Sequence, residues 1–291
     1  MNLKRIKTFM MVLDHKNFST VANILNISQP AVSKQIKTLE VELGITLLDR
    51  ETLEPTEAGR LVYQQGRHFL YDWEVLVEEC RRLQGELTGV IKIGASTVPG
   101  TYIIPQLLRK FLDKHPNVDI QLSIHESDEI KDLIREGSID IGFVGSEPIG
   151  EEIISHIVKS DHFILIGPNA SEKITNLNTL KNLPFIFRTE KSGTWQGVVK
   201  SLASMGISTN ELQCIARVKS TEAVISMVEA NLGYSVVSSI AATKAVEQGR
   251  VKLIQQLPFK RNFYLTYVQT KKIHPAIVSL VSICSEETIG K

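Results

Sequence analysis

Residues 26–40, NISQPAVSKQIKTLE, have the pattern of a helix with two very different sides. Val32, Ile36 and Leu39 recur at the i, i+4, i+7 spacing of one buried helix face. Small, polar and basic groups occupy the other side: Gln29, Pro30, Ser33, Lys34 and Lys37. Such a helix packs on neighbouring helices through its apolar stripe and leaves its other face to solvent or to a partner.

The surrounding sequence predicts two helices before this one and a sharp stop after it. The first helix is expected at residues 2–15, and Ser19 is expected to cap a short second helix. Ser28 is a suitable N-cap for the third helix, and Pro30 fits its first turn, where a missing backbone N–H costs nothing. Gly44 suits the C-terminal stop. Three helices with a tight turn between the second and third form the helix-turn-helix arrangement.

In that arrangement the third helix enters a DNA major groove about 12 Å wide. Gln29 and Ser33 would then reach base edges, and Lys34 and Lys37 would reach bases or phosphates. Residues 1–40 hold six basic residues against Asp14 and Glu40, a local net charge of +4, whereas the whole chain carries +1. From periodicity alone, a solvated polar face on a core helix explains the pattern equally well.

A long helix is predicted from residue 56 to about residue 84. Its apolar stripe, with successive spacings of 7, 4, 3, 4 and 3, consists of Val62, Phe69, Trp73, Leu76, Cys80 and Leu83. This is a heptad seam in which Gly66 occupies the one position without a large side chain. The stripe could pack on its own chain, but a dimer seam is favoured, because a dimer presents two recognition helices to two half-sites.

Beyond GELTG at residues 85–89, strand patterns alternate with helix patterns. Strands are expected at 90–96, 119–126, 139–145, 156–168, 184–188, 212–218 and 233–238, and the helices between them include 101–114, 194–205 and 221–229. This alternation predicts an α/β fold with a largely parallel, helix-covered sheet. About 200 such residues suit two subdomains, whose cleft is the expected ligand site.

The chain resembles the LysR-type bacterial transcriptional regulators over essentially its full length. The residues that carry the resemblance include FSTVANILNISQPAVSKQIKTLEVELGITLLDR, TEAG, IKIGAS and STEAVISMVEANLGYSVVS. The resemblance implies a winged helix-turn-helix domain (1–58), a linker and dimerisation helix (59–88) and an effector-binding domain (89–291) similar to type 2 periplasmic binding proteins. In the last, subdomain I would span about 90–162 and 265–291, and subdomain II about 163–264.

The resemblance also implies what the protein binds. Double-stranded DNA, a small anionic effector and further copies of the chain, as a homodimer or homotetramer, are the expected partners, and RNA polymerase is left open as another. No enzymatic activity, cofactor or metal is expected. The implied DNA-binding residues are Ser28, Gln29, Pro30, Ser33, Lys34, Lys37 and Arg50.

The segment expected to form the wing departs from the family pattern. It reads RETLEPTEAG at residues 50–59, about two residues shorter than usual, with Glu51 and Glu54 and no second arginine. A shorter, more acidic wing should make fewer phosphate contacts and give a smaller salt dependence of DNA binding.

Three polar segments are expected to meet at the effector cleft, because each joins a predicted strand to a predicted helix. Helix N-termini and hydroxyl groups recognise anions at such places. The candidate residues are Ser96, Thr97, Arg188, Ser192, Gly193, Thr194, Ser220 and Thr221. Each Ser or Thr alone is well explained as a plain N-cap, and Arg188 could bridge surface acids instead of a ligand carboxylate. Trp195 could flank the ligand or pack between the subdomains.

Other classes of protein find less support. An enzyme would need a nucleophile and a base, for which Asp161, His162 and Ser192 are the nearest candidates, but no catalytic motif accompanies them. A free solute-binding protein would need a signal peptide, and none is expected at the start of this sequence because Lys7, Asp14 and His15 interrupt its apolar patch, so a cytoplasmic protein is expected. Cys80, Cys214 and Cys284 lack metal-ligand spacing and are interpreted as small apolar fillers, with a redox role for Cys214 as the weaker alternative.

Overall fold

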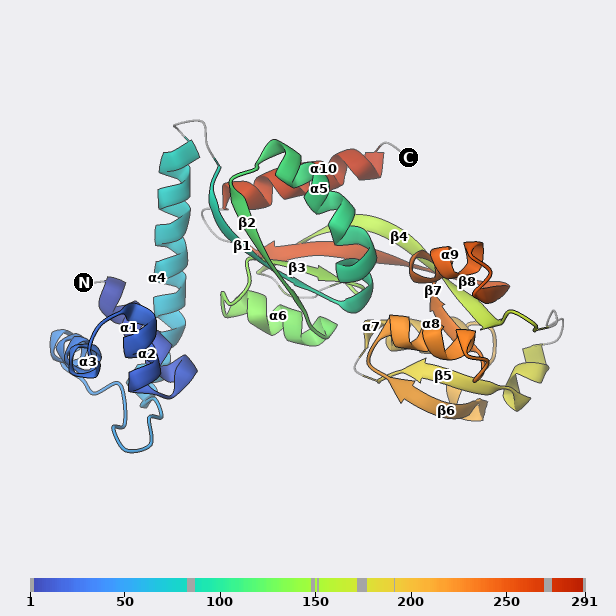
Figure 1. Cartoon of the computed structure of the whole chain (residues 1–291), viewed down its shortest axis with the longest axis horizontal. Helices are drawn as coiled ribbons and strands as arrows, with labels where there is room; N and C mark the ends of the chain where they lie inside the picture. The colour runs from blue at the N-terminus through green and yellow to red at the C-terminus, as the bar shows by residue number, and fades with distance from the viewer. Residues whose placement is uncertain are drawn as a thin grey trace. The chain divides into compact units, whose positions relative to one another are not determined.

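The computed structural model describes residues 3–82, 87–147, 150, 152–171, 177–190, 192–269 and 274–289, except for the side chains of residues 78, 82 and 286–289. The chain divides into two compact units, Met1–Leu83 and Gln84–Lys291 (Figure 1). Each unit has its own hydrophobic core and is described separately.

The first unit consists of helices α1 (Leu3–His15), α2 (Phe18–Leu25), α3 (Gln29–Leu43) and α4 (Glu57–Arg82). Val32, Ile36 and Leu39 are at most 1% exposed, which confirms the apolar stripe predicted for the third helix. They share a core with Phe9 of α1 and Val21 of α2. The other face of α3 is thereby turned away from this core.

The ends of the helices follow local capping chemistry. Ser28 caps α3 as predicted, its Oγ accepting the N–H of Ala31 at 3.4 Å, and Gly44 ends the helix with φ of +67°. The prediction that Ser19 caps α2 is wrong. The cap is Asn17, whose side chain accepts the backbone N–H groups of Ser19 (2.8 Å) and Thr20 (3.0 Å), so the helix starts at Phe18, two residues earlier than a Ser19 cap would place it.

The second unit contains a six-stranded sheet in the order β2-β1-β3-β8-β4-β7 and a two-stranded sheet, β5-β6. The strands are β1 (Gly89–Ala95), β2 (Val118–Ile124), β3 (Ile141–Val144), β4 (Ile153–Pro168), β5 (Pro184–Arg188), β6 (Gln213–Val218), β7 (Ser235–Ser238) and β8 (Val251–Val268). The pairs β1-β2, β1-β3 and β5-β6 are parallel.

The expectation of a largely parallel sheet is wrong for the part of the larger sheet that extends from β3 to β7. There β8 pairs antiparallel with both β3 and β4, and β4 pairs antiparallel with β7. The reason is that β4 and β8 are long strands of 16 and 18 residues that lie side by side in opposite directions. They connect the strands around β1 to those around β7 (Figure 1).

Helices cover both sides of these strands. A π-helical turn (η1, Pro99–Ile103) leads into α5 (Ile104–Lys114), and the other α-helices are α6 (Ser127–Arg135), α7 (Gly193–Ala203), α8 (Thr221–Glu229), α9 (Ser239–Glu247) and α10 (Pro275–Ile289). Short 3-10 helices η2 (Leu177–Asn182) and η3 (Thr209–Glu211) complete the described elements. The helix predicted at 221–229 is confirmed at both ends. In Figure 1, α5 and α10 lie together, and α6 lies across the strands from them.

Candidate functional site

The outer face of α3 is polar and accessible. Ser28, Gln29, Pro30, Lys34 and Lys37 are exposed, and Ser33 is half-buried. In the described part of the chain, neither Lys34 nor Lys37 has a carboxylate within ion-pair distance, and Gln29 only accepts a 3.3 Å hydrogen bond from the Ser19 hydroxyl. The face therefore keeps its positive charge and its hydrogen-bonding groups available for a partner.

Arg50, the arginine expected in the wing, forms an ion pair with a residue of α3. Its Nη2 lies 2.7 Å from Oε2 of Glu40, while Oε1 of Glu40 accepts the backbone N–H groups of Leu47 and Leu48. Across the turn, Glu54 forms an ion pair with Lys16. The Arg50–Glu40 pair reduces the positive charge that the turn offers to a phosphate, and the Lys16–Glu54 pair neutralises a lysine beside it.

The apolar stripe of α4 is covered at one end and exposed at the other. A Cβ added at Gly66 would lie 2.7 Å from Cγ2 of Ile6, so this part of the stripe packs on α1, and Val62 is half-buried beside it. Phe69, Trp73 and Leu76 are 48%, 51% and 40% exposed, and Cys80 is also exposed. Leu83, the last predicted member, lies outside the described residues.

The second unit contains a small cavity where several strand ends and helix starts converge. Its accessible volume is about 10 Å³, which is room for about one water molecule. Six of the eight predicted effector residues line it, together with six that sequence reasoning missed. The predicted ones are Ser96, Thr97, Arg188, Ser192, Gly193 and Thr194, and the missed ones are Val98, Glu126, Ser127, Gly145, Arg261 and Phe263.

Ser220 and Thr221 do not line the cavity. Ser220 caps α8 by accepting the N–H of Ala223 at 3.4 Å, and Thr221 is buried behind Arg188. The Thr221 hydroxyl accepts a 2.7 Å hydrogen bond from Nη1 of Arg188. Thr221 therefore acts on the cavity through the position of that guanidinium.

Arg188 is 4% exposed at the end of β5, so the interpretation of it as a surface bridge is wrong. Its Nη2 donates to the Thr97 hydroxyl at 3.4 Å and lies 4.0 Å from the carboxylate of Glu126, while Nε has no partner among the described residues. Burial lowers the pKa of Arg188, and the negative charge of Glu126 partly opposes this.

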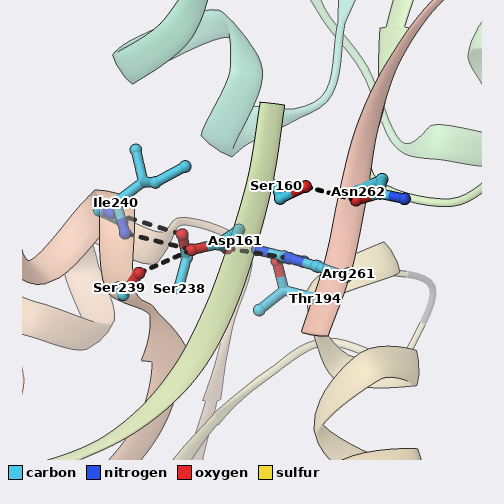
Figure 2. Close-up of polar contacts among 9 residues, drawn as sticks. Ser160, Asp161, Thr194, Ser238, Ser239, Ile240, Arg261 and Asn262 are labelled. Carbon is cyan, nitrogen blue, oxygen red and sulfur yellow. Dashed lines mark hydrogen bonds and ion pairs between the residues drawn. The ribbon is translucent and has the colours of Figure 1, made fainter. Parts of the chain in front are cut away.

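Arg261, which sequence reasoning missed, enters the cavity from β8. Its Nε lies 3.1 Å from Oδ2 of Asp161 on β4, and its Nη1 lies 3.4 Å from the Thr194 hydroxyl. Figure 2 shows Asp161 between Arg261 and the start of α9, where its Oδ1 accepts from the Ser239 hydroxyl (2.9 Å) and the Ile240 N–H (3.3 Å). Burial, chiefly, lowers the pKa of Arg261; the charge and hydrogen bond of Asp161 partly oppose this, and the charge of Arg188 adds a smaller lowering.

The residues considered for catalysis do not form a catalytic pair. Asp161 is engaged by Arg261 and α9, and the Ser192 Oγ accepts the backbone N–H of Trp195 at 3.4 Å as an N-cap. His162 is absent from the lining of the cavity. Trp195 does not line it either. The centroids of the Trp195 and Phe187 rings are 4.8 Å apart, and the Arg217 guanidinium lies 4.5 Å from the centroid of the Trp195 ring.

The cysteines only partly match their interpretation as apolar fillers. Cys284 is buried, but Cys80 and Cys214 are exposed, the latter because β6 is an edge strand of the small sheet. Across the described ranges, no group of three or more His, Cys, Asp or Glu side chains is placed to hold a metal ion. No helix among those described is long and apolar enough to span a membrane.

Comparison with known families identifies the class of protein. The family model described as "Bacterial regulatory helix-turn-helix protein, lysR family" matches residues 3–60, and the "LysR substrate binding domain" model matches residues 84–288. The chain belongs to the LysR family: it is a DNA-binding transcriptional regulator with an effector-binding domain and is not an enzyme.

Individual relatives agree with this assignment. The chain is 32% identical over 267 residues to a probable RuBisCO transcriptional regulator of Trieres chinensis, a match that covers 87% of this chain and 85% of that protein. Full-length CbnR in complex with its target DNA shares the fold, with a TM-score of 0.69 and 22% identity over 98% of this chain and 99% of that one. The regulatory domain of Synechocystis PCC6803 CcmR in complex with 2-PG gives a TM-score of 0.61 and 18% identity, and the match covers 69% of this chain and 98% of that one.

Proposed function

We propose that this regulator is controlled by a small anion that binds in the cavity of its second unit. The observation that supports this proposal is that one buried guanidinium, that of Arg188, lies at the same cavity as the hydroxyls of Thr97 and Ser192 and the N-terminus of α7. Helix N-termini, hydroxyls and arginines are the groups that proteins use to bind oxyanions and carboxylates. In this proposal residues 1–58 bind DNA, 59–88 link and dimerise, and 89–291 bind the effector.

The cavity as it stands is too small for an organic anion, because about 10 Å³ holds about one water molecule. Binding therefore requires the residues around it to move apart, and the anion stabilises the arrangement in which they have done so. An effector changes DNA binding only if it binds two arrangements of the protein with different affinities.

At the other end of the chain, Gln29 and Ser33 specify the operator, and Lys34 and Lys37 attract the duplex. This division of roles is supported by the exposure of Gln29, Lys34 and Lys37, beside the half-buried Ser33, and by the absence of ion-pair partners for the two lysines in the described part of the chain. Because Arg50 is paired with Glu40, the short wing adds little to the grip on phosphates. The exposed part of the α4 stripe joins two copies, which presents two such faces to two half-sites.

The test is a thermal-shift screen of the full-length protein against sulfate, thiosulfate, phosphate, 2-PG and small carboxylates at constant ionic strength. At least one anion should raise the melting temperature, because a ligand that binds only the folded state stabilises it. The double variant Thr97→Ala/Ser192→Ala should lose that shift and still bind DNA. The proposal fails if no anion shifts the melting temperature, or if the variant responds as the parent does.

A further inference from the structure

Two buried groups of like charge face the cavity. Arg188 reaches it from β5 and Arg261 from β8, and they are 4% and 8% exposed. Burying one guanidinium is unfavourable unless an opposite charge compensates, and a second one nearby adds repulsion. An arrangement of this kind persists when a counter-charge is provided, either by the protein or by a ligand.

The protein itself provides only part of the compensation. Asp161 is fully buried and bound to Arg261, but it also accepts two hydrogen bonds at the start of α9, so its charge is shared with that helix. Glu126 lies 4.0 Å from Arg188, and its side chain is one-third exposed. A carboxylate at that distance and exposure compensates a buried guanidinium only weakly.

Three polar groups of the lining have no hydrogen-bond partner in the described part of the chain. They are Nε of Arg188, Nη2 of Arg261 and Oγ of Ser127. Buried donors are rarely left unpaired in native proteins, because each one loses its hydrogen bonds to water without gaining a partner. These three come from β5, β8 and the start of α6, so they approach the cavity from three different elements.

The starts of two helices add partial positive charge. Ser127 is the first residue of α6, and Gly193 is the first residue of α7. A Cβ added at Gly193 would lie 3.0 Å from the Ser127 Oγ, so the glycine lets the two helix starts approach closely. The positive ends of both helices therefore act on the same small volume.

From this arrangement we propose that the effector carries a doubly charged head group of the phosphate-monoester type, which Arg188 and Arg261 bind together. The inference rests on the proposed function and specifies its ligand. A phosphate dianion offers three strong acceptor oxygens, one for each unpaired donor, and compensates both guanidinium groups. A single carboxylate would leave one of the two arginines with only its protein partner. Glu126 competes with the ligand, because it offers its own charge to Arg188.

The experiment compares methyl phosphate with methyl sulfate by calorimetric titration of the full-length protein at constant ionic strength. The two probes have nearly the same shape, but near pH 8 the phosphate is a dianion and the sulfate a monoanion. Methyl phosphate should bind at least about tenfold more tightly. Its preference should shrink near pH 5.5, because the second pKa of a phosphate monoester is about 6. The affinity for methyl sulfate should not change over this range.

Variants separate the role of each group. Arg188→Gln should weaken methyl phosphate binding about tenfold or more, whereas Glu126→Gln should strengthen it, because the competing charge is removed. Arg261→Lys keeps a positive charge beside Asp161, so the protein stays folded while the planar donor geometry is lost, and binding should weaken. Each variant is first checked for a cooperative thermal transition.

Equal affinity for the two probes, no effect of pH on methyl phosphate binding, or unchanged binding by Arg188→Gln would overturn the inference. Its failure is distinguishable from failure of the proposed function. If a monocarboxylate raises the melting temperature through Thr97 and Ser192 while methyl phosphate does not bind, the cavity still binds an anion and only the double charge is wrong. If no anion in the screen binds, the proposed function itself is wrong.

Discussion

Asp161 and Arg261 are cross-strand partners at the place where β4 and β8 run side by side, and their ion pair is almost fully buried. The adjacent pair, Ser160 and Asn262, is joined by a 2.8 Å hydrogen bond between side chains (Figure 2). The carboxylate of Asp161 also reaches the start of α9, and the guanidinium of Arg261 reaches Thr194 of α7. One buried pair thus connects the two long strands, two helix starts and the cavity.

Replacing Asp161 with alanine should strongly destabilise the second unit. The change leaves the buried Arg261 guanidinium without its carboxylate partner, and breaking a buried pair in this way costs about 3–5 kcal/mol. Urea denaturation followed by circular dichroism measures the loss.

Asp128→Ala is the matched control. Asp128 also has a basic partner, Lys131 at 3.3 Å, but its side chain is 71% exposed, so the loss should stay within about 0.5 kcal/mol. If the two substitutions had similar effects, the Asp161–Arg261 pair would not be an important support of this unit.

The sequence was enough to locate half of the cavity. Thr97, Ser192 and Thr194 are each in a segment that follows a strand and opens a helix, Thr97 after β1 of the larger sheet and the other two after β5 of the small sheet, and such segments commonly form ligand clefts. Arg261 was not predictable by this reasoning, because it lies inside the 18-residue strand β8, among polar and apolar residues without a clear alternation. Its burial depends on the pairing of β8 with β4, a contact between residues 100 positions apart in the chain.

Two other predictions failed for different reasons. Ser19 has the right chemistry for a helix cap, but the Asn17 side chain reaches two N–H groups at once. The number and spacing of strands indicated α/β structure, but strand direction depends on how the chain returns, which the strand patterns do not encode. The apolar stripe of α3 was predictable because its periodicity is local.

Lys34→Gln should weaken DNA binding to about the same extent for every sequence. Loss of one phosphate contact should reduce the slope of log K against log salt concentration by about 1. Fluorescence anisotropy with a labelled duplex from upstream of its own gene, at several salt concentrations, measures this slope.

Lys244→Gln removes an exposed lysine from α9 and should leave the slope unchanged. If Lys34→Gln affected the slope no more than Lys244→Gln does, the outer face of α3 would not be the phosphate-contacting surface.

Gln29→Ala should instead reduce the preference for the specific duplex over a scrambled one by about 1–3 kcal/mol.

The double substitution Trp73→Glu/Leu76→Glu should prevent assembly of the protein. Both side chains are largely exposed on α4, and two charges in an apolar seam are expected to repel when two copies meet. Sedimentation velocity at several concentrations should show a smaller species than the parent. Glu74→Lys, which changes a charge away from the stripe, is the control. A double variant that sediments as the parent does would refute this seam.

Acidification should destabilise the protein in part through His115, whose side chain lies 2.8 Å from the Ser279 hydroxyl of α10. Burial, and secondarily the charge of Lys114, holds the pKa of His115 below its ordinary value of 6.5. The unfolded chain therefore binds a proton at a higher pH than the folded chain, and stability falls as pH drops through about 6.5.

His115→Asn keeps a group that can hydrogen-bond Ser279 and removes this titration. The free energy of unfolding of the parent should decrease more between pH 7 and pH 5 than that of the variant, as measured by urea denaturation. A difference between the two proteins that is the same at both pH values would show that His115 makes no such contribution.

The most direct test of the central claim is the affinity of the full-length protein for duplex DNA from upstream of its own gene, measured with and without the anion that stabilises it most. That anion should change the dissociation constant or the footprint of the parent protein. It should change neither for Thr97→Ala/Ser192→Ala, which should still bind the duplex. If the anion has no effect on the parent, or the same effect on the variant, the cavity is not the site through which this regulator is controlled.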